Sequence, residues 1–90
     1  MKNNKLKRAE KLIKEGAKFW ELGNNSGNNN LLNFYEAKSN DRYNTAEKLI
    51  KEVYPDVIID YPGLYPCYNL KGFDFYSLES LEFHNEVTNE

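Results

Sequence analysis

Two side chains capable of nucleophilic or proton-transfer chemistry each occur once in this 90-residue sequence. Cys67 is the single cysteine and His84 the single histidine. A cysteine nucleophile needs a histidine within hydrogen-bond reach and a third group that orients it, whereas His84 falls in a segment predicted to be a loose tail. One cysteine also excludes an internal disulfide and a cysteine-based zinc site. We therefore expect no catalytic residues, no metal site and no cofactor.

Acidic and amide side chains flank a predicted hairpin between residues 55 and 71. Pro55-Asp56 precedes a short apolar run, and Asn69-Leu70-Lys71 ends the next extended run. This pattern resembles the metal-binding hairpin of the PD-(D/E)xK nuclease superfamily. The resemblance implies Mg²⁺ bound by carboxylates, with Asp56 as a ligand and Lys71 positioning the attacking water. Asn69 stands where that family has an acid, and a neutral amide binds Mg²⁺ poorly. A degenerate metal-dependent nuclease is therefore an alternative to the main hypothesis below.

Aromatic side chains are the most informative feature of the last third of the chain. Residues 54–76 contain seven of the thirteen aromatic residues, more than a small sheet can bury. Tyrosine combines a large contact area with a hydroxyl that tolerates water, and it is enriched at interfaces. We predict a partner-binding patch of tyrosines ringed by carboxylates; the alternative is that the tyrosines fill a thin core. The predicted patch consists of Tyr61, Tyr65, Tyr68, Tyr76, Asp60, Asp74 and Glu79.

Charge is unevenly distributed along the chain. Residues 1–18 carry seven basic and two acidic side chains, whereas residues 19–90 carry five basic and twelve acidic ones, for a net charge of −2. The basic stretch predicts a solvated helix face, or alternatively a nucleic-acid-binding helix. The overall acidity argues against direct nucleic-acid binding, which depends on many phosphate contacts. The basic residues that such binding would use are Lys7, Arg8, Lys11, Lys14 and Lys18.

Size, acidity and the lack of a catalytic set favour a non-enzymatic protein-binding module. The asparagine- and lysine-rich composition is typical of AT-rich genomes, including those of phages. In its narrower form, the hypothesis is therefore a phage or mobile-element inhibitor that occupies the basic groove of a host nucleic-acid enzyme, as anti-CRISPR-type proteins do. Two copies pairing through an edge strand is another alternative. No aliphatic run could span a membrane, and the charged first residues predict no signal peptide, so we expect a cytoplasmic protein.

Helical periodicity dominates the first two thirds of the chain. Apolar spacing predicts a helix over residues 6–22, capped by Asn3 or Asn4 and ended by Gly23. A second helical region covers residues 31–54 and ends before a proline. The polar stretch in its middle leaves open whether it is one helix or two.

The chain is predicted to form one α+β domain. A helical hairpin over residues 5–54 packs on a three-stranded antiparallel meander over residues 56–77, followed by a short closing helix or tail over residues 78–90. Gly16 inside the first helix costs stability relative to alanine, and either the close approach of another backbone or mere sequence drift would explain it. The expected core consists of Leu12, Ile13, Trp20, Leu49, Ile50, Val53, Ile58, Phe73 and Phe75.

Overall fold

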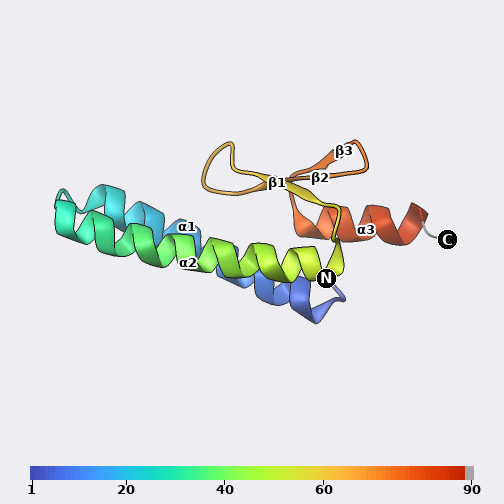
Figure 1. Cartoon of the computed structure of the whole chain (residues 1–90), viewed down its shortest axis with the longest axis horizontal. Coiled ribbons are helices and arrows are strands. Elements are labelled where there is room, and N and C mark those ends of the chain that lie inside the picture. The colour runs from blue at the N-terminus through green and yellow to red at the C-terminus, as the bar shows by residue number, and fades with distance from the viewer. Residues whose placement is uncertain (89–90) are drawn as a thin grey trace.

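A computed structural model describes residues 1–88 as three helices and one three-stranded sheet (Figure 1). In chain order, the elements are α1 (Asn4–Asn25), α2 (Asn29–Val53), β1 (Ile58–Asp60), β2 (Cys67–Leu70), β3 (Phe73–Phe75) and α3 (Leu78–Thr88). The strands lie in the order β1-β2-β3 and both pairs are antiparallel. The α+β fold with an N-terminal helical hairpin is therefore confirmed. Of the predicted closing segment 78–90, residues 89 and 90 lie outside the described residues.

Helix α1 is capped by Asn3 as predicted, but it begins at Asn4 and ends at Asn25, so it is longer at both ends than the predicted range 6–22. The side chain of Asn3 caps it by accepting hydrogen bonds from the backbone N–H groups of Lys5 and Leu6, which satisfies two of the donors that a helix start leaves free. Gly23 does not end the helix, which continues to Asn25. Instead, Gly23 is buried where a Cβ would lie 3.2 Å from Cβ of Tyr35. This glycine therefore lets the two helices approach near the hairpin turn.

Helix α2 is one unbroken helix, and Ser39 in its polar middle faces α1, whereas the neighbouring Asn40 and Asp41 are exposed. Ser39 is fully buried, and its hydroxyl donates a hydrogen bond of 2.8 Å to the backbone carbonyl of Gly16. A Cβ on Gly16 would lie 3.3 Å from the Ser39 carbonyl oxygen and 3.1 Å from the Tyr43 ring. Of the two explanations for Gly16, the close backbone approach is thus confirmed, with α2 as the neighbour.

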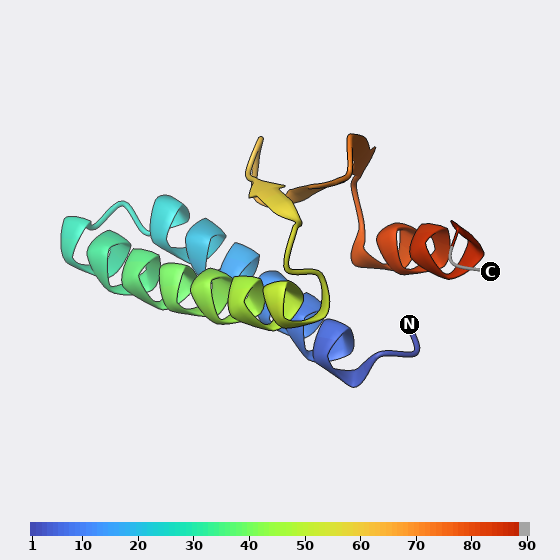
Figure 2. The same cartoon turned by 45° about the vertical axis from the view of Figure 1, so that its right-hand side comes forward.

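The sheet covers only one end of the hairpin. The 22 residues of α1 and 25 of α2 span about 33 and 37 Å, whereas strands of three or four residues span about 10–13 Å. Figures 1 and 2 show the meander and α3 beside the end of the hairpin where the chain begins, with the hairpin turn extending away from them. The molecule is correspondingly long, with extents of 51 × 23 × 17 Å.

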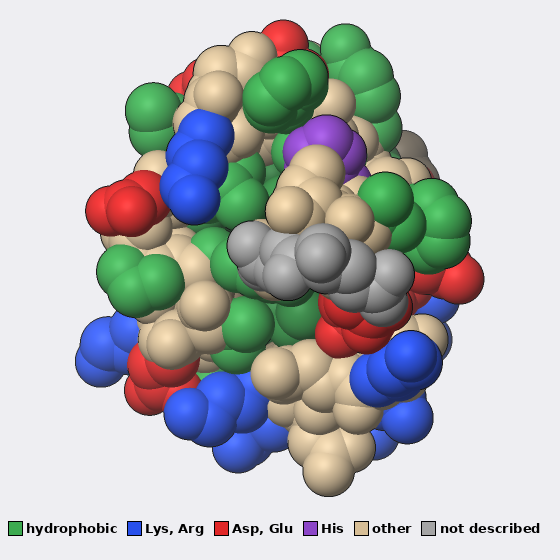
Figure 3. Space-filling model, turned by 90° about the vertical axis from the view of Figure 1, so that its right-hand side faces the viewer, with side chains coloured by type: hydrophobic (Ala, Val, Ile, Leu, Met, Phe, Trp, Pro, Cys, Tyr) green, Lys and Arg blue, Asp and Glu red, His purple; other side chains and the backbone are tan. Residues whose placement is uncertain are grey.

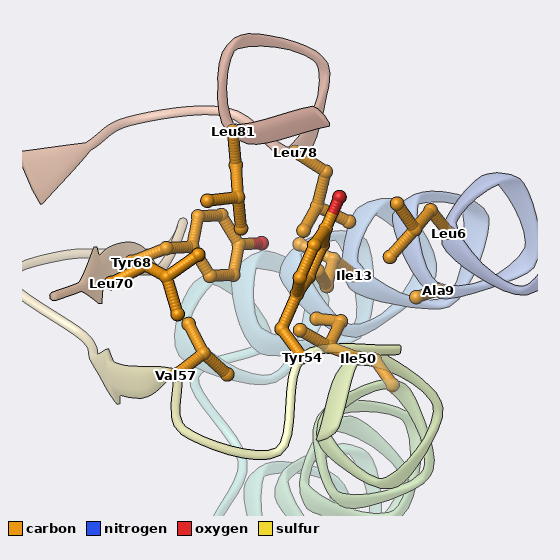
Figure 4. Packing of buried hydrophobic residues seen from close by; sticks show 11 residues of the cluster. Leu6, Ala9, Ile13, Ile50, Tyr54, Val57, Tyr68, Leu70, Leu78 and Leu81 are labelled. Carbon is orange, nitrogen blue, oxygen red and sulfur yellow. The ribbon is translucent and has the colours of Figure 1, made fainter. Parts of the chain in front are cut away.

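The core lies at this covered end and draws on every helix (Figure 4). Leu78 and Leu81 of α3 point toward the rings of Tyr54 and Tyr68. Each fully buried large apolar side chain contributes about 1.5–3 kcal/mol to stability. The buried cluster consists of Leu6, Ala9, Ile13, Ala46, Ile50, Tyr54, Val57, Tyr68, Leu70, Leu78 and Leu81. Of the predicted core residues, Ile13 and Ile50 lie in the cluster, and Leu12, Leu49, Val53 and Phe75 pack against it.

Three predicted core residues are exposed instead. Trp20 is 37% exposed because it lies on a part of α1 that the short sheet does not cover. Ile58 is 60% exposed because its partner in the register is Asn69, on the outer face of the sheet. Phe73 is 58% exposed, and it packs on α3 rather than on the hairpin.

Helix α3 continues through the segment predicted to be frayed. The hydroxyl of Ser77 caps it by accepting from the N–H of Ser80. His84 lies against the rings of Phe73 and Phe75, with centroid distances of 5.1 and 5.0 Å. The end view in Figure 3 shows the histidine at the surface between hydrophobic side chains. These contacts hold the last helix against β3 and explain why it stays ordered past His84.

Candidate functional site

Tyr68 does not belong to the predicted tyrosine patch. Tyr68 is 2% exposed and forms part of the core, because strand alternation turns it and Leu70 inward while Cys67 and Asn69 face outward. Tyr65, three residues earlier, is exposed in the β1–β2 loop. The inclusion of Tyr68 in the partner-binding patch is therefore wrong.

The remaining patch residues come from different elements of the fold. Asp60 and Asp74 share the outer face of the sheet, since they pair with Cys67 and Asn69 in the register. Tyr76 directly follows β3 and is 79% exposed, and Glu79 lies in the first turn of α3. Tyr61 and Tyr65 belong to the loop between β1 and β2, where Tyr61 directly follows Asp60.

The β1–β2 loop folds back along the hairpin (Figure 1) and forms a groove with it. We call this feature the Trp20–Tyr61 groove; its volume is about 400 Å³. Its walls come from α1, α2 and the loop, three segments far apart in the sequence. The residues lining it are Trp20, Asn40, Tyr43, Asn44, Glu47, Tyr61, Gly63 and Leu64.

Tyr43 is the residue that fixes the loop over the groove. Its hydroxyl donates a 2.6 Å hydrogen bond to the backbone carbonyl of Leu64. Its ring meets the ring of Tyr61 at a centroid distance of 5.2 Å and an angle of 59°, a tilted geometry that aromatic pairs favour. Gly16 leaves room for the Tyr43 ring across α1. The groove therefore depends on the same close helix approach that Ser39 and Gly16 establish.

Burial and negative charge shape the electrostatics of the groove. Burial raises the pKa of Tyr61 well above its ordinary value, and the neighbouring carboxylate of Glu47 raises it further. Burial also raises the pKa of Tyr43, against a smaller opposing effect of Ser39. Both hydroxyls are therefore neutral donors at neutral pH. Across the described residues 1–88, no lysine or arginine side chain forms an ion pair with Glu47.

The three residues of the nuclease-like hairpin lie at different places in the fold. The side-chain amide of Asn69 donates to Asp74 at 2.9 Å, and its oxygen accepts from the N–H of Gly72 at 3.4 Å. Lys71 occupies the β2–β3 turn with φ of 54°. Asp56 lies exposed in the turn after α2. Within residues 1–88, no three or more His, Cys, Asp or Glu side chains are grouped so that they could hold a metal ion.

The basic residues of α1 form a stripe. Lys7, Lys11, Lys14 and Lys18 are all exposed, and their spacing puts them on one side of the helix. Only Lys14 of these four forms an ion pair within the described part of the chain, with Glu10 at 3.4 Å. This arrangement matches the predicted solvated face. Among the described residues, no helix has the length and apolarity needed to cross a bilayer.

Of the eight described residues that line the groove, the sequence predicted only Tyr61 as a binding residue. Sequence reasoning assigned Trp20 to the core and did not consider Tyr43 and Glu47 as binding residues. Their spacing of four residues places these two side chains on the same side of α2, which was the available signal. The chain matches no protein-family model, no curated protein and no solved structure.

Proposed function

We propose that this protein is a protein-binding module, and that it binds its partner through the Trp20–Tyr61 groove and the adjacent Tyr65. The observation that carries the proposal is the convergence of three aromatic side chains on one groove at the uncovered part of the hairpin. Tyr65, 56% exposed on the same loop, extends this aromatic surface. Tyrosine and tryptophan are the residues that most often dominate binding energy at protein interfaces.

Site-specific photocrosslinking in the cell that naturally expresses the protein tests this proposal. A photoreactive benzoylphenylalanine replaces Tyr65 in one variant. In the matched control it replaces Phe34, which is 52% exposed on α2 and does not line the groove. We expect a discrete crosslinked protein from position 65 that is absent from position 34 and is lost when Tyr61→Ser is added. Equal crosslinks from both positions, or none from position 65, would contradict the proposal.

The crosslinked species also distinguishes the narrower hypotheses. An inhibitor of a nucleic-acid enzyme should crosslink to a protein with a basic groove, and the yield should fall with added salt because surface charges are screened. A crosslink between two copies of the chain would indicate self-association instead. That the protein lacks enzymatic activity also remains a prediction.

The lysine stripe on α1 favours nucleic-acid binding as a second candidate function. Lys7, Lys11 and Lys18 are exposed and can reach phosphates without breaking an ion pair that the structure shows. This function predicts a gel shift of duplex DNA or RNA by the purified protein at low salt. The shift should weaken in the double variant Lys11→Gln, Lys18→Gln and disappear as salt is raised. No shift at low salt would eliminate this candidate.

A further inference from the structure

The Trp20–Tyr61 groove combines aromatic walls with one carboxylate. Trp20, Tyr43 and Tyr61 present ring surfaces from three different segments, and Glu47 lies on α2 one turn beyond Tyr43. The faces of aromatic rings carry negative electrostatic potential and attract cations. A carboxylate beside such rings adds a direct charge attraction. The groove therefore has the chemistry of a cation-binding site.

Glu47 is available to such a cation. Five other acidic side chains among residues 1–88 pair with a lysine or arginine within 4 Å, namely Glu10, Glu15, Asp41, Glu52 and Glu86. Glu47 does not, although it is only partly exposed. Its neighbour in the groove is the neutral hydroxyl of Tyr61, so its negative charge has no cationic partner among the described residues. A bound cation would supply that partner.

The same chain already shows this chemistry with an occupant of its own. The guanidinium of Arg42 lies over the ring of Phe19 at 5.5 Å from the centroid, and its Nε donates to Glu15 at 3.2 Å. One arginine thus contacts an aromatic ring face and a carboxylate at the same time. The Trp20–Tyr61 groove offers the same two partners with no internal arginine between them among the described residues.

On the basis of the proposed function, we propose that the groove receives an arginine side chain of the partner protein. Arginine fits better than lysine because its guanidinium is planar and weakly hydrated, and because it can stack on rings while it donates to a carboxylate. The amide side chains of Asn40 and Asn44 supply acceptors for its remaining N–H groups. A volume of about 400 Å³ is within the range of small-ligand sites.

Titration of the ¹⁵N-labelled protein with Nα-acetyl-arginine amide tests this inference directly. The chain has one tryptophan, so the indole N–H signal of Trp20 reports on the groove without ambiguity. The neutral isostere Nα-acetyl-citrulline amide is the matched probe, at the same ionic strength. We expect saturable shifts of the Trp20 signal with the arginine probe and binding at least about tenfold weaker with citrulline. Equal shifts with both probes would overturn the inference.

Substitution of the carboxylate supplies the second arm. Glu47→Gln should weaken binding of the arginine probe about fivefold or more. The matched control is Glu36→Gln on the same helix, about 16 Å away along its axis, which should bind like the unsubstituted protein. The amide spectrum shows whether Glu47→Gln perturbs the fold. If it does, Tyr61→Leu provides an independent test, because it should also weaken binding of the arginine probe. An unchanged affinity in both Glu47→Gln and Tyr61→Leu would overturn the inference.

The outcomes also separate this inference from the proposed function. Binding of Nα-acetyl-lysine amide as tight as that of the arginine probe would overturn the choice of arginine. If no cationic probe binds but position 65 still gives its discrete crosslink, the arginine inference fails and the protein-binding module stands. If the arginine probe binds but position 65 gives no crosslink, the proposed function fails instead.

Discussion

Glu82 joins the two ends of the chain, and we expect its neutralisation to destabilise the fold. Its side chain is buried in α3, and its two carboxylate oxygens accept hydrogen bonds from the backbone N–H groups of Lys2 at 2.9 Å and Asn3 at 3.0 Å. Asn3 is also the N-cap of α1. The carboxylate therefore lies near the positive end of the α1 dipole, where negative charge is stabilising.

Glu82→Gln keeps the size of the side chain but places an NH₂ group opposite one of the two donors. Two hydrogen bonds to a charged acceptor, worth about 1.5–3 kcal/mol each, become one neutral bond worth about 1 kcal/mol. The favourable dipole interaction, about 0.3–1 kcal/mol, is lost as well. Because the freed amides can turn toward water, the lower end of this range applies. We expect a loss of about 2 kcal/mol in the free energy of unfolding, or about 8–16 °C in Tm.

Urea unfolding followed by circular dichroism measures this loss at neutral pH. Glu86→Gln is the matched control, because Glu86 lies one turn later on α3 and, within the described part of the chain, pairs with the Lys2 ammonium at 3.7 Å. Exposed ion pairs of this kind contribute about 0–1 kcal/mol, so the control should stay near the unsubstituted protein. If Glu82→Gln costs no more than Glu86→Gln, the backbone bonds do not stabilise the chain and the reasoning is refuted.

Three further predictions follow from the helix approach and the buried tyrosines. Gly16→Ala gains about 1 kcal/mol of helix propensity but crowds the Tyr43 ring, which costs about 1–3 kcal/mol. Thermal unfolding should therefore show that the free energy of unfolding falls by about 1 kcal/mol, and a rise in Tm would contradict this prediction. Tyr43→Phe removes the bond to Leu64 and should cost about 1 kcal/mol and speed amide exchange in the β1–β2 loop, whereas unchanged exchange would show that this bond does not anchor the loop. Burial raises the pKa of Tyr68, so the stability it confers is complete below the ordinary tyrosine value of 10.0 and falls as pH rises above it. The difference between the urea midpoints at about pH 8 and about pH 11 should therefore be smaller in Tyr68→Phe than in the unsubstituted protein. An equal difference in both proteins would show that Tyr68 does not cause this pH dependence.

The sequence predicted the element types well because each depends on local periodicity. The apolar spacing of the helices and the turn residues around the strands are properties of short segments. The predicted end of α1 was wrong because the true end depends on a contact with α2, outside the helix's own sequence. Gly23 continues the helix where Tyr35 of α2 packs against it, although a glycine at this position usually terminates one. Ser39 illustrates the same limit, since only the opposing carbonyl of Gly16 shows that a polar residue belongs inside the hairpin.

The binding patch was harder to predict. Alternation along a strand shows which side chains share a face of the sheet, but it does not show whether another part of the chain covers that face. Alternation within a strand says nothing of Tyr65, which lies in the loop before β2, and it does not show which face of β2 the rest of the chain covers. The register and the position of α3 decide that Tyr68 is buried. Trp20 illustrates the converse error. Its helical spacing is that of a core residue, but it is exposed because the three strands are too short to reach it.

Because the hairpin is much longer than the sheet, the residues that stabilise the fold and those proposed to bind a partner lie in different regions of the molecule. The buried cluster joins α3, the sheet and the covered end of the hairpin, whereas the groove lies where the β1–β2 loop folds back toward Trp20. Among residues 1–88, Tyr43 alone of the groove residues contributes to both, since it packs against the core and bonds to the loop. Groove substitutions such as Glu47→Gln should therefore change affinity with little effect on Tm. Substitutions at Tyr43 should change both, because its ring is where the two regions meet.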